Sequence, residues 1–124
     1  MIYLNTSYLI ALVTVHSPVR TQLYHWMTSG EEFSASTVAW SEFLNGPVSV
    51  QEARDVSTIL QGRLIPFGEP EAVKAAELFN RTGRKRQKQI DCFIAATAIC
   101  ARAPLATRNK KDFGPFVPLG LRLA

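Results

Sequence analysis

The sequence predicts an α/β fold of three layers, α/β/α, with a mainly parallel central sheet of four to five strands. Two observations lead to this prediction. Short β-prone segments alternate with longer segments of helical periodicity, which is the pattern of βαβ units. The segment from Ile90 to Arg102 is almost wholly apolar, as expected of a helix buried against a sheet. A length of 124 residues suffices for one hydrophobic core, and we treat residues 1–124 as a single domain.

The first half of the chain contains two predicted strands. Ile2 to Leu4 is a short β-prone run, and Phe33 to Ala35 is a second one. Pro18 follows a break and suits the first turn of a helix, because that position needs no backbone N–H. Ser36 or Thr37 caps the helix after the second strand. The helices expected in this half cover about residues 8–15, 18–30 and 36–46.

The second half contains two more predicted strands and a candidate for a fifth. Leu64 to Phe67 and Leu105 to Thr107 are β-prone, and Leu119 to Leu123 is the fifth candidate. Glu69-Pro70-Glu71 favours a helix start, because acidic side chains stabilise the positive end of a helix. The helices expected in this half cover about residues 50–60, 69–82 and 90–102.

The composition excludes several classes of protein. No apolar run approaches the ~20 residues of a membrane span, and the first residues lack the basic segment of a signal peptide. Cys92 and Cys100 are separated by roughly 12 Å along one predicted helix, too far for a disulfide. His16 and His25 lack the spacing of a zinc site. We therefore expect a cytoplasmic protein without a membrane anchor.

The charge is distributed unevenly along the chain. Residues 1–80 hold four basic and eight acidic residues, whereas residues 81–124 hold ten basic and two acidic ones. A basic half of this kind favours contact with a polyanion such as nucleic acid. The alternative is a solvated helix end, where cations interact with the negative end of the helix dipole. The residues predicted to contact a nucleic-acid backbone are Arg81, Arg84, Lys85, Arg86 and Lys88, with Arg108, Lys110 and Lys111 extending the same face.

Polar residues follow two of the predicted strands. In open parallel sheets, ligands bind beyond the carboxyl ends of the strands. Asn5 and Thr6 follow the first strand, and Thr107 ends the fourth, with Arg108 and Asn109 directly after it. Three acidic residues come from other segments that the fold can bring to this edge: Glu42, Asp91 and Asp112.

Each of these residues also has a structural interpretation. Asp91 at the start of a helix suits the positive end of the helix dipole. Glu42 shares a polar helix face with its neighbours, and Asp112 suits a loop or a helix cap. Asn5 suits a turn. The functional interpretation therefore depends on the whole set and on no single member.

Four segments together carry a family resemblance. They are the opening MIYLNTSYLI, SEFL around Glu42, DCFIAATA from Asp91, and TRNKKDF from Thr107. In this order they resemble PIN-domain proteins, particularly the VapC-type toxins of VapBC toxin–antitoxin pairs. The resemblance spans nearly the whole chain, and its most specific pieces are the segment around Asp91 and the Thr-Arg-Asn ending.

The resemblance implies an endoribonuclease that depends on Mg²⁺ or Mn²⁺. It assigns direct metal contact to Asp91 and to the position of Asn5. Glu42 and Asp112 would bind the metal through water or orient the attacking water. Thr6 and Thr107 would position water or phosphate, and whether Asn109 or Asp112 supplies the fourth position stays open. The implied partners are RNA, a VapB-type antitoxin and a second copy of the chain, in a homodimer and in a toxin–antitoxin hetero-oligomer.

Asn5 departs from the family pattern, which has aspartate at this position. The amide oxygen can still contact a metal, but it brings a dipole in place of a full charge. Since Mg²⁺ gives up its waters reluctantly, we expect weaker metal binding and strongly reduced cleavage. The change is either an introduced disabling substitution or a natural one, and an aspartate codon in the native gene would exclude the natural variant.

Two other functions remain open from the sequence. One is a PIN nuclease of RNA processing without a toxin role, and the other is a non-catalytic module that holds RNA or an antitoxin. A dinucleotide-binding enzyme is disfavoured, because no glycine-rich loop follows the first strand. The segment between Tyr8 and Trp26 and the helix around Trp40 are apolar enough to predict an exposed partner surface.

Overall fold

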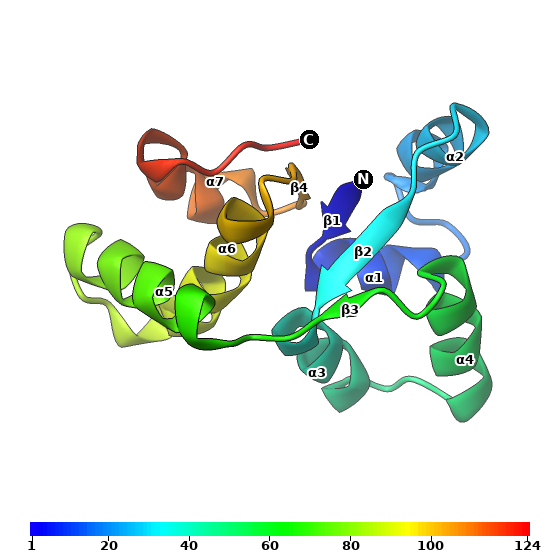
Figure 1. Ribbon diagram of the computed structural model, residues 1–124. Coiled ribbons are helices and arrows are strands. Elements are labelled where there is room, and N and C mark those ends of the chain that lie inside the picture. Colours follow the sequence, from blue (N-terminus) through cyan, green and yellow to red (C-terminus); the bar gives the residue numbers. More distant parts are fainter.

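The computed structural model describes residues 1–124 and contains a four-stranded parallel sheet with helices on both sides (Figure 1). The strand order is β3-β2-β1-β4, so the first strand lies inside the sheet. Register is set by pairing of Ile2 with Phe33, of Leu4 with Ala106 and of Ala35 with Leu64. The strands are β1 (Ile2–Leu4), β2 (Phe33–Ser36), β3 (Leu64–Ile65) and β4 (Leu105–Ala106).

Helices connect every pair of successive strands, as the alternating pattern predicts. Ser36 caps the helix after β2, where its hydroxyl accepts a hydrogen bond from the backbone N–H of Ala39 at 3.0 Å. Ser49 and Glu52 form a reciprocal capping box at the next helix. The α-helices are α1 (Thr6–Leu12), α2 (Arg20–Thr28), α3 (Thr37–Asn45), α4 (Val50–Ile59), α5 (Glu69–Arg81), α6 (Gln89–Ala101) and α7 (Lys110–Phe113).

The apolar helix α6 is buried as predicted. Its residues from Ile94 to Ala98 are all at most 2% exposed. Three of these five side chains are alanine, which lets neighbouring elements approach the helix closely. Helix α5 packs along α6, and the two lie side by side in Figure 1. This packing fixes the start of α6, where Asp91 lies, against the rest of the core.

The predicted fifth strand does not form. Residues 114–119 instead form a 3₁₀ helix, η2 (Gly114–Leu119), which contains two prolines. This 3₁₀ helix extends to Leu119, the first residue of the predicted strand, and so shortens the stretch that could pair. Gly120, at φ 115°, then turns the chain so that only Leu123 makes a single parallel bridge with Leu105. The C-terminal segment thus covers the β4 edge without adding a strand.

Several element boundaries differ from the prediction. Helix α1 starts at Thr6 and ends at Leu12, and α2 starts at Arg20, two residues after Pro18. Two short elements were not predicted: η1 (Arg86–Lys88) before α6, and α7 after β4. Both are single turns, too short for periodicity to reveal. They matter because they carry Lys88 and Asp112.

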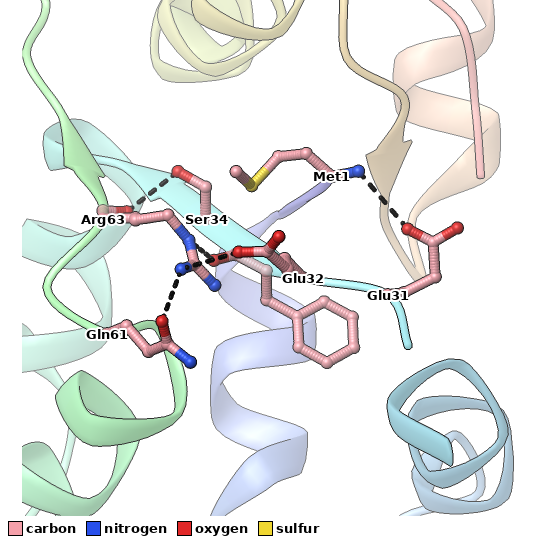
Figure 2. A network of polar contacts seen from close by, with 7 residues as sticks. Met1, Glu31, Glu32, Ser34, Gln61 and Arg63 are labelled. Carbon is pink, nitrogen blue, oxygen red and sulfur yellow. Dashed lines mark hydrogen bonds and ion pairs between the residues drawn. The ribbon is translucent and has the colours of Figure 1, made fainter. Parts of the chain in front are cut away.

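The opposite, amino-terminal edge of the sheet is held by a network around Arg63 (Figure 2). The Arg63 guanidinium donates to the Phe33 carbonyl at 2.9 Å and pairs with Glu32 at 3.0 Å. Ser34 in turn donates to the Arg63 carbonyl at 2.8 Å. These contacts join β3 to β2 at the end of the sheet away from Asn5 and Thr107.

No helix of this chain combines the length and apolar character that crossing a membrane requires. Both cysteines are free, in agreement with a separation too large for a disulfide. Cys92 is buried and Cys100 is exposed.

Candidate active site

Asn5 and Thr107 meet at the carboxyl edge of the sheet, as predicted. The parallel pairing of β1 with β4 brings them together, since the residues before them, Leu4 and Ala106, are partners. The Asn5 amide donates to the Thr107 hydroxyl oxygen at 2.9 Å. The same oxygen accepts the backbone N–H of Asn109 at 3.0 Å. Thr107 is buried. Its hydroxyl therefore holds both the Asn5 side chain and the turn after β4 in place.

The carbonyl oxygen of the Asn5 side chain has no hydrogen-bond partner, although it is buried. A buried polar atom left unpaired costs about 1–3 kcal/mol. This one therefore marks a place where the fold alone leaves a polar requirement unmet. A hydrogen-bond donor such as a water molecule, or a bound cation, would meet it.

Glu42 is tied to the same edge through Thr6. The Thr6 hydroxyl donates to a Glu42 carboxylate oxygen at 2.6 Å. Because Thr6 follows Asn5 directly and Glu42 is exposed on α3, this bond links the end of β1 to the helix after β2. It gives Glu42 a fixed orientation that a solvated helix residue lacks.

Asp91 lies in the first turn of α6, which starts at the carboxyl edge because it leads back into β4. Burial raises the pKa of Asp91 above its ordinary value. The Lys88 ammonium opposes this shift, whereas the negative charges of Asp112 and Glu42 add to it. The three acids therefore lie close enough together for their charges to interact.

Lys88, the last residue of η1, forms an ion pair with Asp112 in α7. Their side chains are 29% and 47% exposed, respectively. The pair explains an acid that stands isolated in a basic stretch of sequence. Sequence reasoning assigned Lys88 only to nucleic-acid contact and missed this role. No local signal indicates this pair, because its two residues lie 24 apart on separate single-turn elements.

The donor chemistry fits a hard cation that retains water. An amide oxygen without a partner and nearby carboxylates are the oxygen ligands that Mg²⁺ and Mn²⁺ prefer. No three acidic, histidine or cysteine side chains lie close enough together to hold an ion alone. Mg²⁺ commonly binds through one or two carboxylates, waters and substrate phosphate, and these residues match that mode.

A family model of the PIN domain matches residues 2–114. The chain belongs to the PIN domain family. The match spans all four strands and the candidate site, so the family predicted from the sequence motifs is confirmed. Comparison of this PIN domain with curated proteins finds no match.

Solved structures of similar fold cover almost the whole PIN domain. FitAcB from Neisseria gonorrhoeae matches with a TM-score of 0.72 and 22% identity, covering 99% of this chain and 96% of its own. VapBC2 from Rickettsia felis, bound to a promoter DNA fragment, gives 0.70 and 23%, covering 100% and 98%. A toxin–antitoxin complex from Klebsiella pneumoniae gives 0.71 and 24%, covering 91% and 90%. At these identities the likeness establishes a common fold.

The predicted basic face of the PIN domain is only partly free of acidic partners. Arg81 pairs with Glu77 at 3.6 Å, and Lys88 pairs with Asp112. The other basic residues of both predicted groups have no ion pair and are exposed: Arg84, Lys85, Arg86, Arg108, Lys110 and Lys111. The backbone N–H of Arg108 donates to the Ser7 hydroxyl at 3.0 Å, a contact to the first helix that sequence reasoning did not identify.

The helices predicted to leave apolar surface do so. Tyr24 on α2 is 70% exposed and Leu44 on α3 is 47% exposed. Trp26 and Trp40 are partly buried, and Phe43 is fully buried in the core. A hollow of about 440 Å³ lies beside α2, lined by Leu12, Arg20, Thr21, Leu23, Tyr24, Met27 and Ile59.

Replacing Asp91 is expected to stabilise the metal-free domain. The pKa of Asp91 is raised, so folding disfavours its charged form, and stability falls as pH rises from its ordinary pKa through the raised one. Asp91→Asn should therefore raise the free energy of unfolding near pH 7, by less than about 1 kcal/mol because Asp91 is only half-buried and solvent screens its charge. Urea unfolding measures this, and the gain should shrink near pH 4. A variant less stable than the parent at neutral pH would contradict the assignment.

Proposed function

We propose that this PIN-domain protein is the endoribonuclease toxin of a VapBC-type toxin–antitoxin pair, dependent on Mg²⁺ or Mn²⁺ and attenuated by Asn5. The observation that carries the proposal is the buried Asn5 side-chain oxygen, which has no hydrogen-bond partner. It lies at the sheet edge where Asn5 bonds Thr107 and the neighbouring Thr6 bonds Glu42. The motif resemblance and the toxin–antitoxin complexes among the similar structures support the same function.

Each residue of the candidate site has a proposed role. Asp91 and the Asn5 oxygen would hold the cation. Glu42, oriented by Thr6, and Asp112 would hold and orient water. A bound Mg²⁺ or Mn²⁺ would lower the pKa of that water and stabilise charge on the scissile phosphate. Between the two candidates for the fourth position we favour Asp112, because its charge acts on Asp91, whereas Asn109 has a backbone contact with Thr107.

The proposed partners follow from the surface. An apolar segment of a VapB-type antitoxin would cover the hollow beside α2, and a homodimer and a hetero-oligomer would bury further apolar helix surface. The two free cysteines are consistent with a location in the reducing cytoplasm, where the toxin would act on RNA.

The test of the proposal is cleavage of small structured RNAs by the Asn5→Asp variant in Mg²⁺ or Mn²⁺, beside this chain and a chelator control. A screen of tRNA, rRNA and DNA separates a toxin from a nuclease of RNA processing. The neutral Asn5, in place of the family's aspartate, favours a second candidate function, a non-catalytic module that holds RNA or an antitoxin. A module of that kind would bind RNA but show no titration with Mn²⁺.

Neutralising the unpaired basic residues should weaken RNA binding and flatten its salt dependence. Arg84→Gln, Lys85→Gln and Arg86→Gln together remove three exposed charges that have no acidic partner. Because each phosphate contact on a single strand contributes about −0.7 to the log–log salt slope, the slope should shrink by about 2. Fluorescence anisotropy between about 50 and 200 mM salt measures it. An unchanged slope would exclude this segment from the RNA surface.

A further inference from the structure

A second hollow, of about 430 Å³, lies where α5 ends and α6 begins. Its lining is chemically specific: one aromatic ring, two guanidinium groups and one carboxamide, with no acidic side chain. The residues are Phe79, Arg84, Arg86 and Gln89. Its volume falls in the range of small-ligand sites.

Arg84 is held in this hollow by an unusual backbone. Its φ is 56°, in the left-handed region that residues other than glycine rarely adopt, and Gly83 before it has φ 97°. The turn is closed by a hydrogen bond from the Arg84 N–H to the Phe79 carbonyl at 2.9 Å. The Arg84 guanidinium lies over the Phe79 ring, 5.5 Å from its centroid, and donates to the Asn80 side chain. This closure of the α5 end fixes the Arg84 backbone beside the Phe79 ring.

We propose that this hollow binds one nucleotide of a single-stranded RNA segment. The inference rests on the proposed function, because it places one substrate nucleotide next to the site. Stacked on Phe79, the guanidinium of Arg84 offers a flat cationic surface on which a base stacks. Arg86 has no acidic partner and binds the phosphate, and the Gln89 carboxamide bonds the base edge.

The position of the hollow ties it to the candidate active site. Gln89 is the first residue of α6, and Asp91 lies two residues further on. Residues two apart on a helix point to different faces, so the two sites flank the first turn of α6. A single-stranded segment with one base in the hollow would cross this turn to reach the carboxylates. An acidic peptide is a poorer match, since it would use the two arginines but neither the ring nor the carboxamide.

The test uses neutral substitutions, so that base recognition separates from general charge. Phe79→Leu and Gln89→Ala should each weaken binding of a short single-stranded RNA without changing the salt slope. Phe79→Leu removes the ring that supports the Arg84 guanidinium, so the expected loss is about 5-fold, the lower end of the range for one stacked base. Gln89 is exposed, so its variant tests the site without disturbing the core. Arg54→Gln, which removes an exposed charge on α4, is the matched control and should change affinity little.

Binding is measured by anisotropy in chelator, with the chain as it stands, so the result does not depend on cleavage. If RNA binds and both neutral variants bind as tightly as the parent, the hollow is no nucleotide site, while the nuclease proposal survives. Binding of an oligoglutamate as tightly as RNA of equal charge would overturn base recognition as well. If Asn5→Asp cleaves no RNA while the neutral variants lose affinity, the nucleotide site stands and the nuclease proposal fails.

Discussion

The Asn5→Asp variant should cleave structured RNA at least about 100-fold faster than the present chain in Mg²⁺ or Mn²⁺. A change to an outer-shell partner of a metal site typically alters affinity or activity 10- to 100-fold, and a directly bound ligand should exceed that. The amide oxygen at this position is already buried and unpaired, so the carboxylate would occupy a prepared place. Its second oxygen would replace the amide that now donates to Thr107, and the Thr107 hydroxyl can donate instead.

Two controls sharpen this measurement. Asn5→Asp combined with Asp91→Asn should lose the gained activity, because it again removes one charge from the same set. Mn²⁺ binding by calorimetry should tighten in Asn5→Asp and weaken in the double variant, independently of cleavage. Tight Mn²⁺ binding with no cleavage of any RNA would reject the nuclease and leave a metal-stabilised binding module.

The second large effect concerns stability. Phe113→Ala should lower the free energy of unfolding by about 3–5 kcal/mol, because it empties a fully buried ring position. Phe113 ends α7 and packs edge-on against Phe116, with ring centroids 5.9 Å apart. Since domains of this size are stable by only about 5–15 kcal/mol, the variant should unfold at much lower urea concentration.

Phe113 also holds its neighbour Asp112 in place. Loss of the ring should loosen the pairing of Asp112 with Lys88, so metal binding should weaken even in the folded fraction. Val117→Ala is the matched control, because Val117 is 46% exposed and its change should stay within about 0.5 kcal/mol. If Phe113→Ala lowered the free energy of unfolding as little as Val117→Ala does, α7 and η2 would not be part of the cooperative core.

The sequence predicted the parts of the fold that depend on local pattern. The alternation of strands and helices, the Ser36 cap and the apolar helix near Asp91 each follow from a few adjacent residues. The predicted strand at Leu119 to Leu123 failed because Pro115 and Pro118 already direct the preceding segment into a 3₁₀ helix. A β-prone composition over five residues did not outweigh that constraint.

The candidate site was predictable only in its strand-end part. Asn5 and Thr107 are joined by the general rule for parallel strands, so their contact could be expected. The pairing of Lys88 with Asp112 spans 24 residues and depends on two single-turn elements. Neither the direction of those turns nor the reach of a lysine side chain follows from local pattern. The left-handed Arg84 depends likewise on the way α5 ends.

The two borders of the sheet determine how this protein can associate with others. β3 has only two residues and is braced by Arg63, while β4 is shielded by the segment that ends at Ala124. Neither border offers a row of free amides for strand addition. Copies and partners must therefore associate through side chains on helices. The backbone amides of β1 and β2 should then exchange hydrogen at the same slow rate before and after assembly. Protection gained on association should appear instead at helix ends and loops.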